Sequence, residues 1–216
     1  YSAFIQGFMP STARPEVVFL TYGGCLPARG VNRSKPGFRC NTFTDKAWQY
    51  LQTEKIDRLV IISRWIQYFY DADGQPTPYL CFSANNSCQE LIASEAQRTR
   101  LFQQLHDDLQ PLRAKGVDIR LVGPVPYSTV NYLSSKSKAI AAEHLPVMHW
   151  IYSQTQGDEF NSRIPGRQDL LGYLRTLSAS LGAPLTDPAD LMCQAGRCSF
   201  VDARHMPYYK DDNHLN

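Results

Sequence analysis

Residues 58–63 read Arg58-Leu59-Val60-Ile61-Ile62-Ser63, an apolar run with the length and composition of a buried β-strand. Farther along, residues 94–115 carry leucines at helical spacing, and Gly116 follows as a stop signal. Residues 118–122 (DIRLV) then form a second strand-like run. A strand, a long helix and another strand in this order predict a βαβ unit with two parallel strands in one sheet.

The flanking segments extend this pattern in both directions. The further elements expected are a strand over residues 16–20 (EVVFL), a helix over residues 42–52 with Asn41 or Thr42 as N-cap, a loop over residues 71–86, a helix over residues 167–181 and a hairpin over residues 191–201. Alternating strands and helices predict an α/β fold with a parallel sheet and helices on both faces.

Length and charge exclude several classes of protein. The chain has 216 residues, which suits one domain or at most two small ones. Its net charge of +2 gives no electrostatic reason to expect nucleic acid or an anionic membrane as the main partner. No apolar run approaches the roughly 18–20 residues that span a bilayer.

The six cysteines fall into three neighbouring pairs, Cys25–Cys40, Cys81–Cys88 and Cys193–Cys198. Short loops close at low entropic cost, so these pairings are favoured among the 15 that six cysteines allow. Free thiols or a zinc site are the alternatives, but no second short C-x₂₋₄-C pair completes a zinc site. Disulfides would indicate an oxidising compartment, either the periplasm or the outside of the cell.

Active sites of parallel sheets gather at the carboxyl ends of the strands. Gly24 follows the first expected strand, with Gly23 as an adjacent possibility, and Arg64 follows the second. The N–H of a glycine after a strand and the guanidinium of an arginine there are candidate oxyanion donors. The alternatives are a turn glycine and a surface arginine stacked on Trp65.

The chain end carries a D-x-x-H spacing, Asp211 and His214. One tight turn would place the carboxylate on the imidazole, fixing its tautomer for proton transfer. A solvated polar tail is the alternative, and Asp202 with His205 has the same spacing. The sequence has no G-x-S-x-G, no G-x-G-x-x-G, no P-loop and no H-E-x-x-H, which limits nucleotide-cofactor and metalloprotease chemistry.

A set of short segments, in this order, resembles the SGNH domain at the C-terminal end of acyltransferase family 3 membrane proteins. The segments are Gly24-Cys25-Leu26-Pro27, Cys40-Asn41-Thr42-Phe43, Ile61-Ile62-Ser63-Arg64-Trp65, the pair Cys193 and Cys198, and Tyr208-Tyr209-Lys210-Asp211-Asp212-Asn213-His214-Leu215. The resemblance implies a three-layer α/β/α sandwich of the SGNH-hydrolase, flavodoxin-like type, spanning residues 1–216 as one domain. It also implies a Ser-His-Asp triad to which Asp211 and His214 belong, with Gly24 in the oxyanion hole.

Two positions depart from the family pattern. The family's nucleophile lies in a G-D-S-H element before the first helix, and these 216 residues contain none. We therefore expect the serine upstream of Tyr1, with Ser2 as a weaker alternative that lacks the preceding Gly-Asp, and we expect a chain without that block to be inactive. Arg64 stands near the place of the usual oxyanion-hole asparagine, as in this subgroup.

The resemblance implies an O-acyltransferase, acting as the periplasmic domain of a bacterial inner-membrane protein. Its acceptor would be a hydroxyl of a cell-envelope glycan such as lipopolysaccharide O-antigen. No resident cofactor is expected, because the fused membrane domain would supply an acetyl group that comes ultimately from acetyl-CoA. The alternatives are a secreted or periplasmic carbohydrate esterase of the same fold and a non-catalytic glycan-binding module with Trp48, Trp65 and Trp150 as stacking surfaces.

Overall fold

The structure is a computed structural model that describes residues 17–71, 75–126, 159–161, 166–199 and 208. The chain forms two compact units. The larger one comprises Leu20–Pro124 and Pro165–Pro188, and the smaller one comprises Tyr1–Phe19, Val125–Ile164 and Ala189–Asn216. Each unit is described by itself.

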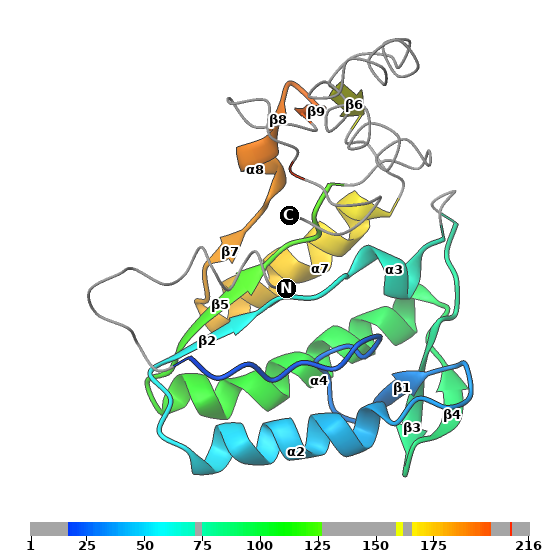
Figure 1. Cartoon of the computed structure of the whole chain (residues 1–216), viewed down its shortest axis with the longest axis vertical. Helices are drawn as coiled ribbons and strands as arrows, with labels where there is room; N and C mark the ends of the chain where they lie inside the picture. Colours follow the sequence, from blue (N-terminus) through cyan, green and yellow to red (C-terminus); the bar gives the residue numbers. More distant parts are fainter. Residues whose placement is uncertain (1–16, 72–74, 127–158, 162–165, 200–207, 209–216) are drawn as a thin grey trace, which may run out of the picture. The chain divides into compact units, whose positions relative to one another are not determined.

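A parallel sheet lies at the centre of the larger unit (Figure 1). Its strands are β2 (Arg58–Ile61), β5 (Asp118–Val122) and β7 (Leu185–Thr186), in the order β2-β5-β7. Both pairings are parallel, so the carboxyl ends of the strands lie along one edge. This confirms the βαβ unit expected from residues 58–63, 94–115 and 118–122, although β7 is too short for its sequence to reveal it.

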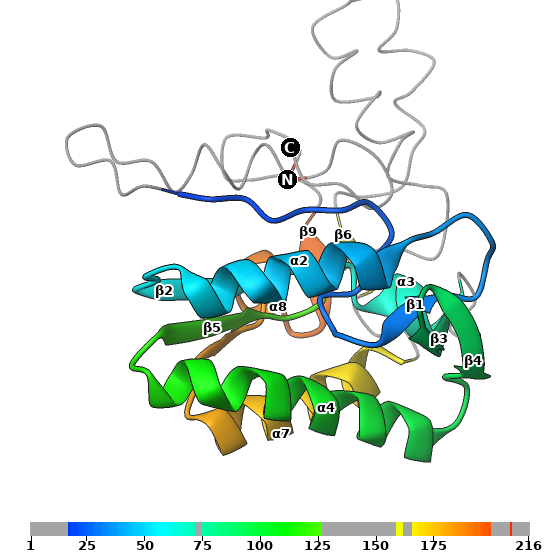
Figure 2. The same ribbon diagram turned by 90° about the horizontal axis from the view of Figure 1, so that it is seen from below.

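Two long helices, α4 (Glu95–Ala114) and α7 (Arg167–Leu181), lie side by side on one face of this sheet (Figures 1 and 2). Helix α4 begins with a capping box, in which the Ser94 hydroxyl and the Gln97 side chain each bond the backbone of the other residue. Its buried residues include the leucines at helical spacing, and those of α7 are mostly leucines as well. Burial of these apolar stripes holds both helices to the sheet.

A second, antiparallel sheet consists of β1 (Val31–Arg33), β3 (Leu80–Ala84) and β4 (Ser87–Leu91), in the order β1-β3-β4. It corrects the loop expected over residues 71–86. Asn85 and Asn86 both have positive φ, 51° and 63°, in the tight turn between β3 and β4. A two-residue turn of this kind joins antiparallel strands, and the asparagine pair was the missed sequence signal.

Two further helices belong to the larger unit, α2 (Cys40–Thr53) and α3 (Ile66–Phe69). Helix α2 begins two residues before the expected position 42. The strand expected over residues 16–20 is not found: residues 17–20 have no strand partner in the described chain, and their large apolar side chains are exposed. A strand needs a hydrogen-bonding neighbour, so apolar composition alone predicted the element wrongly; Glu16 lies outside the described residues.

The described part of the smaller unit holds α8 (Ala189–Met192) and the strands β6 (Glu159–Asn161), β8 (Cys193–Gln194) and β9 (Arg197–Ser199). The strands pair antiparallel in the order β6-β9-β8. Ala195 and Gly196, both at positive φ, form the turn of the hairpin predicted over residues 191–201. In neither unit do the described residues include a helix with the length and hydrophobicity to cross a bilayer.

Candidate functional site

Disulfides join the three neighbouring pairs of cysteines, Cys25–Cys40, Cys81–Cys88 and Cys193–Cys198. The first closes a loop that leads from Gly24 to the start of α2, the second links β3 to β4, and the third crosses the β8–β9 hairpin. No cysteine remains free. Three disulfides in one small chain are typical of proteins that fold in an oxidising compartment outside the cytoplasm.

Gly24 lies directly before the first disulfide, in a conformation that favours glycine. Its φ is +84°, and a Cβ added to it would lie only 2.6 Å from a carbon of the Phe38 ring. The half-buried Gly24 donates its N–H to no acceptor in the part of the chain that the structure describes. Position 24 therefore requires glycine for both conformation and space, and it offers an unused backbone donor.

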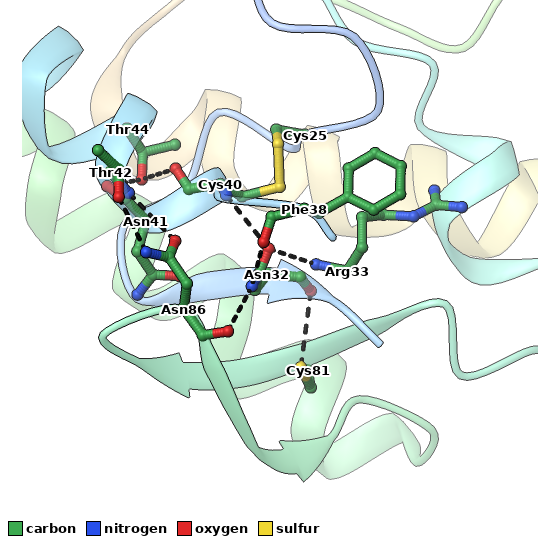
Figure 3. Close-up of a disulfide and its surroundings, with 10 residues drawn as sticks. All are labelled: Cys25, Asn32, Arg33, Phe38, Cys40, Asn41, Thr42, Thr44, Cys81 and Asn86. Atoms are coloured by element: carbon green, nitrogen blue, oxygen red, sulfur yellow. Dashed lines mark hydrogen bonds between the residues drawn. A yellow bond between two sulfur atoms is a disulfide. The ribbon is translucent and has the colours of Figure 1, made fainter. Parts of the chain in front are cut away.

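Asn32, in β1, fixes the other end of the loop that contains Phe38 (Figure 3). Its side chain is buried and makes four hydrogen bonds. The amide nitrogen donates to the carbonyls of Phe38 (3.1 Å) and Asn86 (2.9 Å), while the amide oxygen accepts from the N–H groups of Arg33 (2.9 Å) and Cys40 (3.2 Å). One side chain thus ties β1, the loop, α2 and the β3–β4 turn together.

The N-terminus of α2 is capped from a distance, which corrects the expected N-cap at Asn41 or Thr42. Arg39 occupies the N-cap position and makes no side-chain cap. The Asn32 oxygen accepts from the N–H of Cys40, and the Asn86 oxygen accepts from the N–H of Thr42 at 3.3 Å (Figure 3). Side chains of two distant segments satisfy donors that a local serine, threonine or asparagine would normally satisfy.

Arg64 stands between the end of β2 and the start of α3, at the carboxyl edge of the parallel sheet. Arg64 is half-buried. Its neighbour Trp65 is fully buried and donates its indole N–H to the carbonyl of Val122, the last residue of β5, at 2.8 Å. The Trp65 ring therefore belongs to the core.

The same edge holds a buried ion pair that sequence reasoning missed. Arg167, the first residue of α7, is 3% exposed and pairs through Nη2 with the carboxylate of Asp187, which follows β7. The same nitrogen donates to the carbonyl of Pro124 at 3.2 Å, just beyond β5. The pair ties the start of α7 to the segments that leave β5 and β7, so it fixes the carboxyl ends of two neighbouring strands.

Tyr70, at the end of α3, packs against the N-terminus of α7. A Cβ on Gly166, the N-cap residue of α7, would lie 2.5 Å from the Tyr70 ring. The Tyr70 hydroxyl donates to the carboxylate of Asp169 at 3.1 Å. Burial raises the pKa of Tyr70 to about 12, with the hydrogen bond and charge of Asp169 acting in the same direction. The hydroxyl stays protonated and serves as a donor at neutral pH.

The predicted triad residues Asp211 and His214 lie outside the described residues, as do Asp202, His205 and Ser2. The structure therefore places only the two oxyanion candidates, Gly24 and Arg64, and both belong to the larger unit.

Neither Asn32 nor the Arg167–Asp187 pair carries a motif in the sequence. Asn32 reaches Asn86, 54 residues away, and Arg167 pairs with Asp187, 20 residues away, so only the tertiary fold reveals these contacts.

Comparison with known families and structures gives these features a context. Residues 9–216 match the model of the SGNH domain that is fused to AT3 domains, and the chain belongs to this family. A similar solved structure is the periplasmic domain of a lipopolysaccharide acetyltransferase from Salmonella ser. Paratyphi A, with a TM-score of 0.51 and 13% sequence identity. The match covers 89% of this chain and 63% of that one. At this identity it shows the shared fold, and no curated protein matches the sequence.

Proposed function

We propose that this chain is the acyl-transferring, extracytoplasmic domain of a membrane-bound O-acyltransferase, and that it passes an acetyl group to a hydroxyl of a cell-envelope glycan. The observation that carries the proposal is the match of residues 9–216 to the SGNH domain that is fused to AT3 domains. The three disulfides support a periplasmic location. Lipopolysaccharide is the acceptor that the name of the similar periplasmic domain suggests, and we propose its O-antigen as the part that is acetylated.

The proposed chemistry uses two transfers through a serine ester. In the first, the serine Oγ attacks the acetyl carbonyl carbon while His214 takes the hydroxyl proton. The bond from that carbon to the donor breaks, and the leaving group takes the proton from His214. Asp211 orients the imidazole and stabilises its protonated form. The serine is expected N-terminal to Tyr1, in the G-D-S-H element of the family.

In the second transfer, a sugar hydroxyl attacks the ester carbon and gives its proton to His214. The serine oxygen leaves and takes this proton back, which regenerates the enzyme and yields the O-acetylated sugar. No resident cofactor takes part in either step. The acetyl group is delivered through the fused membrane domain, ultimately from acetyl-CoA.

The N–H of Gly24 and the guanidinium of Arg64 are the proposed donors to the oxyanion that forms in both steps. The positive φ of Gly24 and its unused N–H support this role. An N–H without an acceptor in the described chain can donate to the developing negative charge without first breaking another hydrogen bond. Arg64 stands at the carboxyl edge of the sheet, where active sites of such folds gather.

The test compares two histidines of the full-length membrane protein. Cells that produce His214→Ala or the matched control His205→Ala are assayed for O-acetyl groups on their envelope glycan by NMR. We expect His214→Ala to lose on the order of 10³-fold or more of the activity, and His205→Ala to keep it. Equal O-acetylation in both variants, at equal protein levels, would refute the proposed triad, and release of free acetate without glycan acetylation would establish an esterase instead.

A further inference from the structure

Arg33, at the end of β1, carries a charged side chain that has no role in the proposed chemistry. The central carbon of its guanidinium lies over three aromatic rings, at 5.4 Å from the centre of Phe38, 5.6 Å from Tyr68 and 5.3 Å from Tyr79. Three rings around one arginine hold its side chain in a fixed orientation, because each adds an attraction between the cation and the ring face. We call this group the Arg33 cage.

The charge of Arg33 has no counterpart in the protein as far as the structure describes it. No described carboxylate lies within ion-pair distance of its guanidinium, and its buried Nε has no hydrogen-bond acceptor. An orphaned buried donor on a cation is costly. A guanidinium whose faces contact aromatic rings can still donate hydrogen bonds, because its N–H groups lie in the plane of the group. This geometry suits a carboxylate or a phosphate.

The surroundings of the cage are basic. From position 17 to position 44 the chain has four basic residues, Arg29, Arg33, Lys35 and Arg39, and no acidic one. Arg29 is compensated by Asp45 and Asp108, at 3.8 and 3.6 Å. Lys35 and Arg39 are exposed, and neither pairs with a carboxylate among the described residues. The segment of residues 33–39 therefore presents uncompensated positive charge to solvent.

The cage adjoins the proposed oxyanion donor and is held rigidly. Phe38, one of the three rings of the cage, faces the Arg33 guanidinium and also fills the space next to Gly24. The Asn32 hydrogen bonds and the Cys25–Cys40 disulfide close the loop at its base (Figure 3). Tyr79 is 38% exposed, which leaves ring surface on which the apolar face of a sugar can pack. Such preorganisation favours ligand binding because little is left to order.

We propose that the Arg33 cage is a binding subsite for an acidic sugar of the glycan acceptor, whose carboxylate or phosphate pairs with the Arg33 guanidinium while its ring packs on Tyr79. The inference rests on the proposed function for the identity of the acceptor. It adds that the acceptor carries a negative charge near the hydroxyl that is acetylated. Arg33 is then a specificity-determining residue, and it takes no part in the chemistry.

The test measures binding directly, by isothermal titration of the full-length protein in detergent. The probes are a galacturonic acid trisaccharide, its methyl ester, which removes the charge at nearly the same shape, and mannose 6-phosphate as the phosphate source. We expect the acid trisaccharide or the sugar phosphate to bind at least about tenfold more tightly than the ester. This preference should shrink as salt rises from 50 to 500 mM, because exposed charges are screened.

Two variants of Arg33 and a control variant assign the preference to the cage. Arg33→Gln should lose it, Arg33→Lys should keep part of it, and Arg175→Gln, at an exposed arginine of α7, should behave as the wild type. His214→Ala should bind every probe normally, so a failure of the proposed triad is distinguishable from a failure of the subsite. In turnover assays, Arg33→Gln should raise KM for an anionic acceptor and leave kcat nearly unchanged.

Three outcomes would overturn the subsite. They are equal binding of the ester and of both charged sugars by the wild-type protein, an unchanged preference in a folded Arg33→Gln protein, and binding to vesicles of anionic phospholipid without binding to either charged sugar. The first and third need no variant, so the proposal is tested even if Arg33→Gln fails to fold.

Discussion

The carboxyl edge of the parallel sheet holds the proposed oxyanion donor Arg64, and the disulfide-closed loop of residues 25–40 directly follows the other, Gly24. Different forces stabilise these two regions. At the sheet edge, Trp65 and the Arg167–Asp187 pair are buried beneath packed helices. In the loop, residues 33–39 are half-buried or exposed, and a disulfide with one asparagine side chain fixes their path. Damage at the edge should therefore unfold the protein, whereas damage in the loop should first disturb the site.

The largest effect is expected at the sheet edge. Arg167→Ala removes the guanidinium that pairs with the largely buried Asp187 carboxylate, which should cost about 3–5 kcal/mol in free energy of unfolding. Urea denaturation of the variant measures this cost. Arg175→Ala, at an exposed position of the same helix, is the control and should change stability by less than about 0.5 kcal/mol. Similar midpoints for both variants would contradict a structural role for the ion pair.

The next effect separates two disulfides. The Cys25–Cys40 bond closes a 15-residue separation and the Cys81–Cys88 bond one of 7, so chain entropy predicts losses of about 3 and about 2.4 kcal/mol when each pair is replaced by serine. The first double variant should also lose transferase activity at temperatures where it remains folded, because the loop beside Gly24 is released. Retention of full activity in that variant would mean that the loop is not part of the site.

Gly24→Ala sharpens the contrast between stability and function. The positive φ and the contact with Phe38 should make the substitution cost about 1–3 kcal/mol, and the displaced N–H should lower kcat by roughly 10²-fold or more. Gly23→Ala is a matched control, since a Cβ at position 23 meets no atom within 4 Å. A Gly24→Ala protein that loses only stability and keeps kcat would contradict the proposed role of this N–H in the oxyanion hole.

The smallest effect concerns Tyr70 and appears only in alkali. Its pKa is raised to about 12 in the folded protein, so the unfolded chain releases the proton near pH 10, before the folded one does. Stability from this group is complete below pH 10 and is lost as the pH rises toward 12. At neutral pH the wild type should be more stable than Tyr70→Phe by about 1 kcal/mol in free energy of unfolding. The melting temperatures of the two proteins should therefore converge as the pH rises over this range. Parallel melting curves would contradict the assignment.

The sequence predicted the sheet edge far better than the loop. Buried strands appear in the sequence as apolar runs, as at residues 58–63 and 118–122. Buried helix faces appear as leucines at helical spacing, as in α4 and α7, so these elements could be predicted directly. The β1-β3-β4 sheet has short strands whose pairing depends on tertiary contacts, and its Asn85-Asn86 turn went unrecognised. Residues 17–20 failed in the opposite direction, because apolar composition does not supply a strand partner.

The candidate site was predictable only in part, for a related reason. Gly24 and Arg64 were proposed because they follow strand-like runs, a position that the sequence displays. The run before Arg64 is β2, whereas residues 17–20 before Gly24 form no strand, and the role of both residues stays a prediction. Asn32, Arg167 and Arg33 act through partners that folding alone brings near, so no local pattern marks them. The cysteines are the exception, since their short separations favoured the pairs that the structure contains.

The central claim is that the domain transfers an acyl group to a glycan and does not merely hydrolyse an ester. The most direct measurement supplies the full-length protein in membranes with labelled acetyl-CoA, with and without envelope glycan, and counts label on the glycan against free acetate. The account predicts that label accumulates on glycan hydroxyls and that this product disappears in His214→Ala. Free acetate as the sole product, formed at the same rate with or without glycan, would contradict it.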